Sequence, residues 1–316
     1  MSVLELRDLS VTYHRKHLPD VTAVAGVDLT VERGEIVGLV GESGCGKSTL
    51  GRAASGLLAP SAGQVLFEGE PITPLGRAPR PRRERRIQMV FQDPNSSLNG
   101  RRKVGDQIAD GLELAADLPA NQRRARVGAL LEQVGLEPRV ASRYPHEFSG
   151  GQRQRICIAR ALSADPSVII ADEPISALDA SAQAQIANLL HELAKDLDVG
   201  LVFISHDLAI VRHIADRVAV MYLGKVAELG STEAVWGAPL HPYSEALIGA
   251  VLHADGTGDM PEALPGDVPD PADPPTGCRF QTRCPMVMDR CREEEPVLAA
   301  PPDGGSRAVA CWLHHE

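Results

Sequence analysis

Apolar positions follow two different patterns in this chain. Over residues 3–9 and 21–31 they alternate with polar positions, which predicts strands with one buried face. Uninterrupted apolar runs occupy 36–40, 168–171 and 201–204, and each is short enough for a single strand. Because strands that are buried on both faces have this pattern, the three runs predict the centre of a parallel sheet.

A helical pattern separates the first of these runs from the others. It extends from about residue 101 to residue 134, with apolar positions at Ile108, Leu112, Leu130, Leu131 and Val134. Strand and helix patterns then alternate from 168 to 222, and residues 224–230 are predicted to form one arm of a hairpin. This order predicts an α/β fold with a parallel core sheet.

Composition limits the possible partners. The formal net charge is -10 and aromatic residues make up 3% of the chain. Both values argue against a nucleic-acid surface, which is usually basic with exposed stacking rings. The sequence has no apolar run of about 18 residues or more, so we expect neither a membrane span nor a signal peptide. A protein of this kind that moves solutes must use a channel built from other chains.

A glycine-rich loop follows the run at 36–40. Residues 41–48 read Gly-Glu-Ser-Gly-Cys-Gly-Lys-Ser, which matches the phosphate-binding pattern GxxxxGK[ST] between a predicted strand and a predicted helix. Backbone N–H groups of such a loop turn toward phosphate oxygens, and the following helix adds its positive end. Lys47 is expected to reach the β- and γ-phosphates, and Ser48 to ligate Mg²⁺. The alternative is a glycine turn without a ligand.

Two other strands end in side chains suited to hydrolysis. Asp172 and Glu173 follow the run at 168–171, and His206 follows the run at 201–204. Ligands of open α/β sheets bind at the carboxyl ends of the strands, so we expect all three side chains near the phosphate loop. One carboxylate can hold Mg²⁺ and the other can orient the attacking water. Without the loop, an acidic turn and a solvated histidine would be the better interpretation.

The sequence Phe-Ser-Gly-Gly-Gln at 148–152 distinguishes one family among nucleotide-hydrolysing proteins. It is close to the LSGGQ signature, with Phe148 in the first position. Together with the elements above, it resembles an ATP-binding cassette (ABC) ATPase from about residue 4 to residue 252. The resemblance implies a head-to-tail dimer, with each ATP between the phosphate loop of one cassette and the signature of the other. The signature would offer a helix N-terminus to the γ-phosphate.

The resemblance also assigns roles to single residues. Glu173 is the expected catalytic base, and His206 the switch that contacts the γ-phosphate. Gln92 is expected to contact Mg²⁺ or water and to sense the membrane subunits, and it joins Ser48 and Asp172 as a Mg²⁺ ligand. The expected ATP-binding residues are Tyr13 (stacking on adenine), Gly41, Ser43, Gly44, Cys45, Gly46, Lys47, Ser48, Thr49, Ser149, Gly150, Gly151, Gln152 and Asp179 (coupling of the two cassettes).

The composition changes after residue 252. Residues 253–277 are rich in Pro, Asp and Gly and predict an extended linker. Residues 278–316 hold four of the six cysteines, Cys278, Cys284, Cys291 and Cys311. A cytoplasmic ATPase is not expected to form disulfides, whereas four thiolates suit Zn²⁺ or an iron–sulfur cluster. The spacing lacks CxxC pairs, which favours a [4Fe–4S] cluster over zinc; unligated thiols are the alternative.

This tail resembles the C-terminal extension of oligopeptide and dipeptide importer ATPases, some of which hold a [4Fe–4S] cluster. The segments at 91–99, 144–148 and 241–243 are similar to the same group, although Asn-Gly-Arg at 99–101 replaces the usual Asn-Pro-Arg. The resemblance implies an ATPase subunit of a peptide importer at the cytoplasmic face of the inner membrane. The implied partners are two permeases, a second cassette of the same or another kind, and an extracytoplasmic binding protein, with no nucleic acid.

Two alternative functions stay open. A nickel or other small-solute importer of the same group is the first, and a soluble ABC protein of translation or DNA repair is the second. One phosphate loop and one signature indicate a single cassette, whereas translation types normally carry two and repair types insert long coiled coils. The expected organisation is an ABC domain at 1–252, with an antiparallel β subdomain and a helical subdomain at about 101–148, a linker at 253–277 and a metal-binding extension at 278–316.

Overall fold

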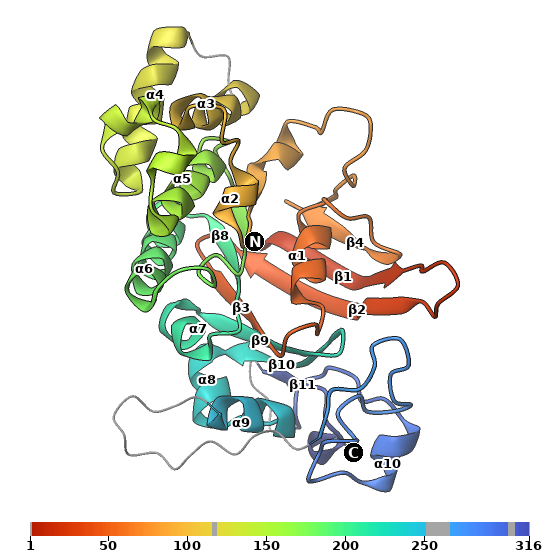
Figure 1. The fold of residues 1–316 in the computed structure, drawn as a ribbon. Coiled ribbons are helices and arrows are strands. Elements are labelled where there is room, and N and C mark those ends of the chain that lie inside the picture. The colour runs from red at the N-terminus through yellow and green to blue at the C-terminus, as the bar shows by residue number, and fades with distance from the viewer. Residues whose placement is uncertain (1, 116–118, 251–265, 303–306, 316) are drawn as a thin grey trace.

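The computed structural model describes residues 2–115, 119–250, 266–302 and 307–315. Figure 1 shows two sheets at the centre of the molecule, a group of helices above them and the end of the chain below them. Strands and helices alternate in the central part, so the fold is of the α/β class that the sequence predicts.

The smaller sheet is antiparallel and has the strand order β2-β1-β4-β5. It consists of β1 (Ser2–Tyr13), β2 (Val21–Glu32), β4 (Ala62–Phe67) and β5 (Glu70–Pro71). One face of this sheet is buried and includes Leu4, Leu6 and Leu29, as the alternating apolar pattern predicts. That face packs on α1 (Lys47–Ala54), the helix that follows the phosphate loop.

The larger sheet has the strand order β11-β10-β9-β3-β8-β7-β6. Its strands are β3 (Ile36–Val40), β6 (Ile87–Val90), β7 (Val168–Asp172), β8 (Gly200–Ile204), β9 (Arg217–Tyr222), β10 (Lys225–Ser231) and β11 (Ala308–Val309). Neighbouring strands from β9 to β6 are parallel to each other. β10 pairs antiparallel with β9, and β11 pairs antiparallel with β10. Every residue of β3, β7 and β8 is buried, which confirms the three predicted core strands. Because these strands are parallel, their carboxyl ends lie at one edge of the sheet.

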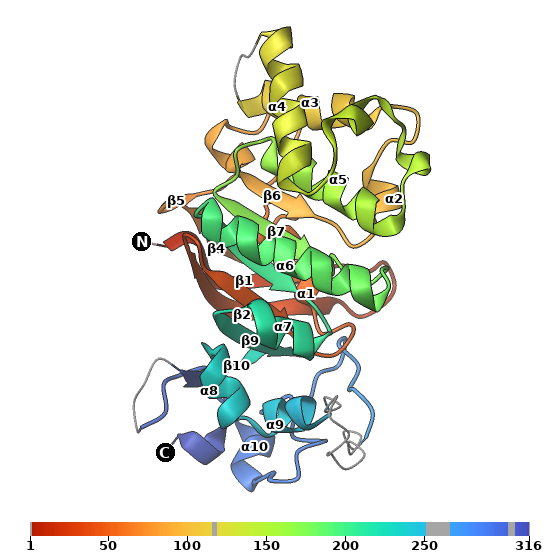
Figure 2. The same cartoon turned by 90° about the vertical axis from the view of Figure 1, so that its left-hand side faces the viewer.

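Helices cover both faces of the larger sheet. α6 (Ala180–Asp196) and α7 (Leu208–Ile214) lie on the face turned toward the viewer in Figure 2. α1 lies between the two sheets, in contact with β7 and β8 of one and with β1 and β2 of the other. α8 (Thr232–Gly237) and α9 (Pro242–Gly249) follow β10. No helix in the described ranges is long and apolar enough to cross a membrane.

A helical region follows β6 and lies at the top of Figure 1. It contains α2 (Pro94–Ser97), α3 (Val104–Ala115), α4 (Ala120–Gln133) and two 3₁₀ turns, Pro138–Ser142 and Pro145–Glu147, before α5 (Gly150–Leu162) returns toward the sheet. The residues predicted to form its apolar face are all buried: Ile108, Leu112, Leu130, Leu131 and Val134. The helical pattern predicted between residues 101 and 134 is therefore confirmed.

The end of the chain packs beside β10, at the bottom of Figure 1. Residues 266–277 contain no helix or strand, and residues 253–265 of the predicted linker lie outside the described ranges. The elements that follow are α10 (Asp289–Glu293), β11 and a 3₁₀ turn at Trp312–His314. Since β11 pairs with β10, the extension adds a strand to the core sheet, a contribution that the sequence did not predict.

Candidate nucleotide site

The glycine-rich loop at residues 41–46 connects β3 to α1, as predicted. Gly41 and Gly46 have φ values of 149° and 106°. A Cβ at Gly41 would lie 2.1 Å from the carbonyl oxygen of Met221, and one at Gly46 would lie 2.1 Å from that of Ala23. Only glycine fits at either position. At Gly44, by contrast, a Cβ would meet nothing within 4 Å, so the loop is open there.

Lys47 begins α1 and is buried, with 4% of its surface exposed. Its Nζ donates hydrogen bonds to the carbonyl oxygens of Gly41 (2.7 Å) and Glu42 (2.9 Å). The ammonium group is therefore held against the loop that precedes it. A phosphate group that enters the loop would find this cation and the N-terminus of α1 together.

Ser48 and Asp172 meet at the carboxyl end of β7. The Ser48 hydroxyl donates a hydrogen bond of 2.7 Å to Oδ1 of Asp172. Burial raises the pKa of Asp172, while the hydrogen bond from Ser48 opposes that rise. Two oxygen groups side by side are the kind of ligand that Mg²⁺ prefers, so these residues fit a magnesium site. Mg²⁺ bound there would neutralise negative charge on phosphate oxygens.

The side chains of Gln92 and His206 both approach the carboxylate of Glu173. Gln92 Nε2 donates a hydrogen bond of 2.9 Å to Glu173 Oε2, and His206 Nδ1 lies 3.6 Å from the same oxygen. The backbone N–H of Glu173 donates to the carbonyl oxygen of Ile204, which fixes the residue beside β8. Its φ of 46° is uncommon for a residue other than glycine. A partly exposed carboxylate in this position can accept a proton from water.

Tyr13 ends β1 near the first turn of α1. Its side-chain oxygen lies 3.3 Å from Oγ1 of Thr49. The residue is 39% exposed although it is large and aromatic. One face of such a ring can stack on a nucleobase, as predicted for adenine, while the hydroxyl keeps a polar partner.

The signature residues lie at the start of α5, apart from the residues above. Ser149 and Gln152 make a capping box, in which each side chain accepts a hydrogen bond from the backbone N–H of the other residue. Asp179 caps α6 by accepting a hydrogen bond of 2.9 Å from the N–H of Ala182. The two helix starts border one cavity of about 290 Å³, and no residue of the 41–49 segment lines it. The structure thus groups the signature with Asp179, apart from the phosphate loop of the same chain.

Known proteins resemble this chain along nearly its full length. The family model for "ABC transporter" matches residues 24–176, and the model for "Oligopeptide/dipeptide transporter, C-terminal region" matches residues 227–291. The probable peptide ABC transporter ATP-binding protein y4tS of Sinorhizobium fredii is 51% identical, over 95% of this chain and 85% of y4tS. The chain belongs to the ABC transporter family. The resemblance deduced from the sequence, including that to the oligopeptide and dipeptide group, is confirmed.

Another relative of this ABC protein is the oligopeptide transport ATP-binding protein AppF of Bacillus subtilis, which is 47% identical over 99% of this chain and 98% of AppF. Among solved structures, cbiO1 of Clostridium perfringens aligns with a TM-score of 0.66 and 32% identity, over 75% of this chain and 91% of cbiO1. The cassette MJ0796, solved as a dimer bound to ADP and Pi, aligns with a TM-score of 0.64 and 27% identity, over 72% of this chain and 98% of that chain. The predicted ABC ATPase fold is confirmed.

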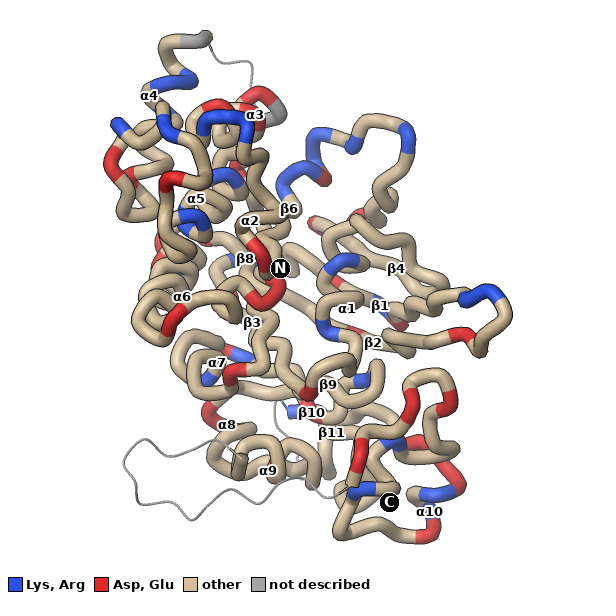
Figure 3. The backbone as a smooth tube through the Cα atoms, viewed as in Figure 1, with Lys and Arg blue, Asp and Glu red and all other residues tan. Residues whose placement is uncertain are grey.

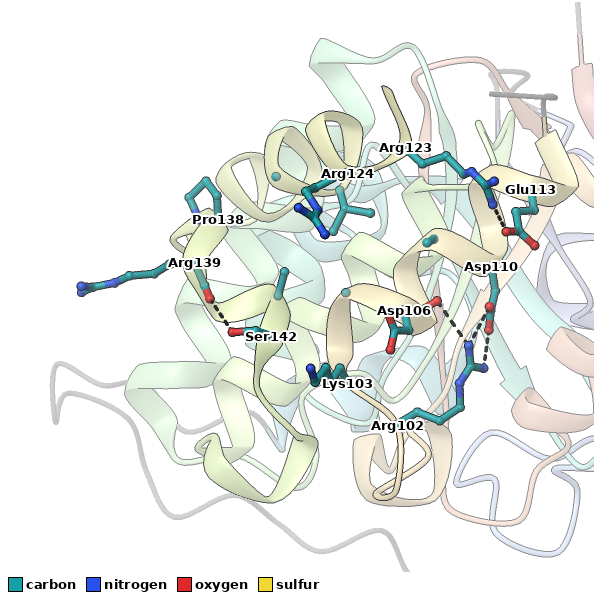
Figure 4. A pocket seen from close by; sticks show the side chains of 15 residues that line it. Arg102, Lys103, Asp106, Asp110, Glu113, Arg123, Arg124, Pro138, Arg139 and Ser142 are labelled. Atoms are coloured by element: carbon teal, nitrogen blue, oxygen red, sulfur yellow. Dashed lines mark hydrogen bonds and ion pairs between the residues drawn. The ribbon is translucent and has the colours of Figure 1, made fainter. Parts of the chain in front are cut away.

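A wide cavity of the ABC protein lies outside the predicted nucleotide site. It has a volume of about 910 Å³ and is bordered by α3, α4 and the turn at Pro138–Ser142. Figure 4 shows two ion pairs in its wall, Arg102 with Asp110 and Arg123 with Glu113. No predicted site residue lines it, so its size alone does not indicate the place of chemistry.

The four cysteines of the extension are all free thiols. Burial raises the pKa of Cys278 to about 11, and the thiols of the other three cysteines contribute to that rise. For Cys278, Cys284 and Cys311, the backbone N–H group two residues later lowers the thiol pKa and opposes the effect of burial; these groups belong to Phe280, Met286 and Leu313. Nevertheless, the described residues include no group of three or more His, Cys, Asp or Glu side chains that could hold a metal ion. The predicted metal centre is therefore not supported by the structure.

One contact of the phosphate loop escaped the sequence analysis. Arg283, from the extension, donates two hydrogen bonds to the Glu42 carboxylate, of 2.7 and 3.0 Å. The hydroxyl of Tyr243, in α9, accepts a hydrogen bond of 2.9 Å from the Glu42 N–H group. Neither residue belongs to a nucleotide-binding motif, and 241 positions separate Glu42 from Arg283. No sequence signal could have found the pair.

Proposed function

We propose that this chain is the ATP-hydrolysing subunit of an importer of dipeptides or oligopeptides. The observation that carries the proposal is the convergence of Gln92 and His206 on one carboxylate oxygen of Glu173, beside the Ser48–Asp172 pair. The peptide-transport relatives and the C-terminal family match support peptides as the solute. A nickel or other small-solute importer is the alternative within the family.

In the proposed reaction, Lys47 binds the terminal phosphates of ATP, and Ser48 and Asp172 hold Mg²⁺. Glu173 takes the proton of the attacking water. Gln92 orients that water or the ion through its amide, and its hydrogen bond to Glu173 supports this position. Tyr13 stacks on adenine, since its exposed ring lies beside the first turn of α1.

We propose further that ATP binds between two cassettes. The signature cavity is not lined by the phosphate loop of its own chain, so a second chain must bring the two half-sites together. Ser149, Gly150 and Gly151 of one cassette would then face the γ-phosphate held by the other. The dimeric form of the MJ0796 cassette supports this arrangement. The second cassette can be a copy of this chain or a related one.

The groove beside the Gln92 loop is the proposed docking site for a permease. It has a volume of about 460 Å³ and is lined by Phe91 and Asn99 of that loop and by residues of α3 and α5. Because Gln92 directly follows Phe91 and bonds to Glu173, an occupant of the groove can act on the catalytic base through one loop. Figure 3 shows Lys and Arg on the loop before β6 and around α3, next to this surface. Two permeases would hold the chain at the cytoplasmic face of the membrane and receive solute from an extracytoplasmic binding protein.

For residues 278–316 we propose a metal-binding extension, separated by a linker from a cassette that ends near residue 252. Cys278, Cys284, Cys291 and Cys311 would bind a [4Fe–4S] cluster, with zinc as the alternative. Burial raises the pKa of three of these thiols, and a backbone N–H group two residues later opposes that rise in each case, so a bound metal would have to stabilise the thiolates.

Copurification from membranes tests the importer proposal. Full-length chain, extracted in detergent, is expected to retain two polytopic membrane proteins and to hydrolyse ATP faster when peptide-loaded binding protein is added. Phe91→Asp places a charge in the groove and should release the membrane proteins. Val297→Asp is the matched control, because Val297 is 72% exposed and lies in the extension. Recovery of ribosomes or DNA without membrane proteins would replace the importer by the soluble alternative.

A further inference from the structure

The extension reaches the nucleotide site through one side chain. Arg283 is almost fully buried, with 4% of its side chain exposed. Its guanidinium donates a hydrogen bond to each carboxylate oxygen of Glu42. It also donates a hydrogen bond of 3.4 Å to the hydroxyl of Tyr222. From this geometry we infer that Arg283 is a positioning residue for ATP, acting through Glu42.

Glu42 is held by three different groups of the protein. Its N–H donates to the Tyr243 hydroxyl, its carbonyl oxygen accepts from Lys47 Nζ and its carboxylate accepts from Arg283. The position of the Lys47 ammonium group is therefore linked to the position of the Arg283 guanidinium by one residue. A bidentate bond to a carboxylate fixes orientation as well as distance, which suits this purpose.

Charge gives Arg283 a second effect on ATP. Glu42 places a carboxylate in the loop that receives the triphosphate, and like charges at short range repel each other. Arg283 neutralises that carboxylate through its two hydrogen bonds. Removing Arg283 leaves a carboxylate without its cation, so ATP binding should weaken more than the chemical step.

The inference also links the extension to the cassette. Arg283 directly precedes Cys284, and Phe280 packs against the rings of Tyr222 and Tyr243 at centroid distances of 5.2 and 5.4 Å. The aromatic contacts fix the position of the extension on the cassette. Arg283 connects the extension, in that position, to the phosphate loop. The role rests on the proposed function of that loop but not on the solute or on the cluster.

A double-mutant cycle on the full-length chain tests the inference. In steady-state ATPase assays, Arg283→Ala should raise KM for ATP roughly tenfold, as expected for a lost charge-assisted hydrogen bond, with kcat nearly unchanged. Arg283→Lys should recover part of the loss. In the Glu42→Gln background, Arg283→Ala should change KM much less, because no carboxylate is left to neutralise. Added salt should reduce the Arg283→Ala effect, since it screens the exposed carboxylate.

Two controls separate this role from simple anchoring of the extension. Arg279 donates to the carbonyl oxygen of Leu223 and to Glu295 but not to the phosphate loop, so Arg279→Ala should leave KM near the wild-type value. Lys47→Ala tests the phosphate loop itself and should abolish ATP binding. Equal KM values for Arg283→Ala and wild type, or an equal loss in the Glu42→Gln background, would overturn the inference. Normal ATP binding by Lys47→Ala would instead overturn the proposed function.

Discussion

The cassette and the extension hold their candidate functional residues in different ways. In the cassette, fully buried strands such as β3, β7 and β8 end at one sheet edge and deliver Lys47, Asp172 and His206 there. In the described part of the extension, few apolar side chains are buried: Phe280, Cys291, Val309 and Cys311. The nucleotide site is therefore a consequence of the core, whereas the cysteines lie in a segment with little core of its own.

Polar contacts with the cassette replace that missing core. Arg307 pairs with the fully buried Glu228 at 2.8 Å, and Glu295 of the extension pairs with Lys225 of β10 at 2.5 Å. The Arg307–Glu228 contact depends on both partners, because a buried charge left alone is strongly destabilising. The extension is therefore built onto the cassette and held by single polar contacts rather than by a core of its own.

The largest expected effect lies in the cassette, at Glu173. Glu173→Gln keeps the shape of the side chain but removes the base, so kcat should fall by about 10²- to 10⁴-fold. ATP binding should persist, since Lys47, Ser48 and Asp172 are unchanged, and the variant should accumulate as an ATP-bound dimer. Radiolabelled ATP hydrolysis and gel filtration measure the two outcomes.

Glu132→Gln is the matched control, because Glu132 is exposed on α4 and far along the chain from the site. It should hydrolyse ATP at the wild-type rate. A Glu173→Gln variant with the same rate as this control would show that another residue acts as the base. The end of β7 would then not supply the catalytic base.

The sequence could predict the cassette site because each part is a short motif beside an apolar run. Parallel pairing of β3, β7 and β8 then brings the motifs together without any further information. The contact of Arg283 with Glu42 had no such signal, since it joins segments 241 positions apart in different elements. β11 was missed for a related reason: two residues are too short for a pattern, and their pairing depends on the exposed edge of β10.

A smaller effect is expected at the signature, where the cassette depends on a second chain. A Cβ at Gly151 would lie 3.4 Å from the Cβ of Ala182, a contact of ordinary length, so Gly151→Asp should fold. Its carboxylate would stand at the start of α5, where the proposed γ-phosphate of the other cassette binds. Repulsion should lower kcat by on the order of a hundredfold while the isolated cassette still binds ATP. Gly151→Ala is the control, and an equal loss in both variants would indicate steric disturbance alone.

The adenine contact should matter less, because it binds the nucleotide without taking part in hydrolysis. Tyr13→Ala removes the ring and should raise KM for ATP about tenfold, within the range measured for base–aromatic stacking. Tyr13→Phe keeps the ring and loses only the 3.3 Å contact with Thr49, so it should stay near wild type. Equal KM values for Tyr13→Ala and Tyr13→Phe would mean that adenine does not stack there.

The smallest effect on turnover is expected from the extension. Cys284→Ser should remove the proposed cluster but leave kcat unchanged, because no step of ATP hydrolysis needs an electron. Its KM for ATP should rise no further than that of Arg283→Ala, since the extension reaches the phosphate loop through Arg283. Protein purified without oxygen should carry roughly four irons per wild-type chain and few in the variant. Cys157→Ala, a buried cysteine of α5, is the control and should keep its iron.

The metal content of the wild-type chain then decides between the possible states of the extension. Colourless protein with one equivalent of zinc would replace the cluster by an ion and keep the metal site. Metal-free protein in which Cys278, Cys284, Cys291 and Cys311 all titrate as thiols would remove both. In that last case the extension would be held only by its contacts with the cassette. The bond between Arg283 and Glu42 would then be one of the few buried contacts of the extension. Arg283→Ala should therefore lower the resistance of the extension to proteolysis as much as any cysteine variant does.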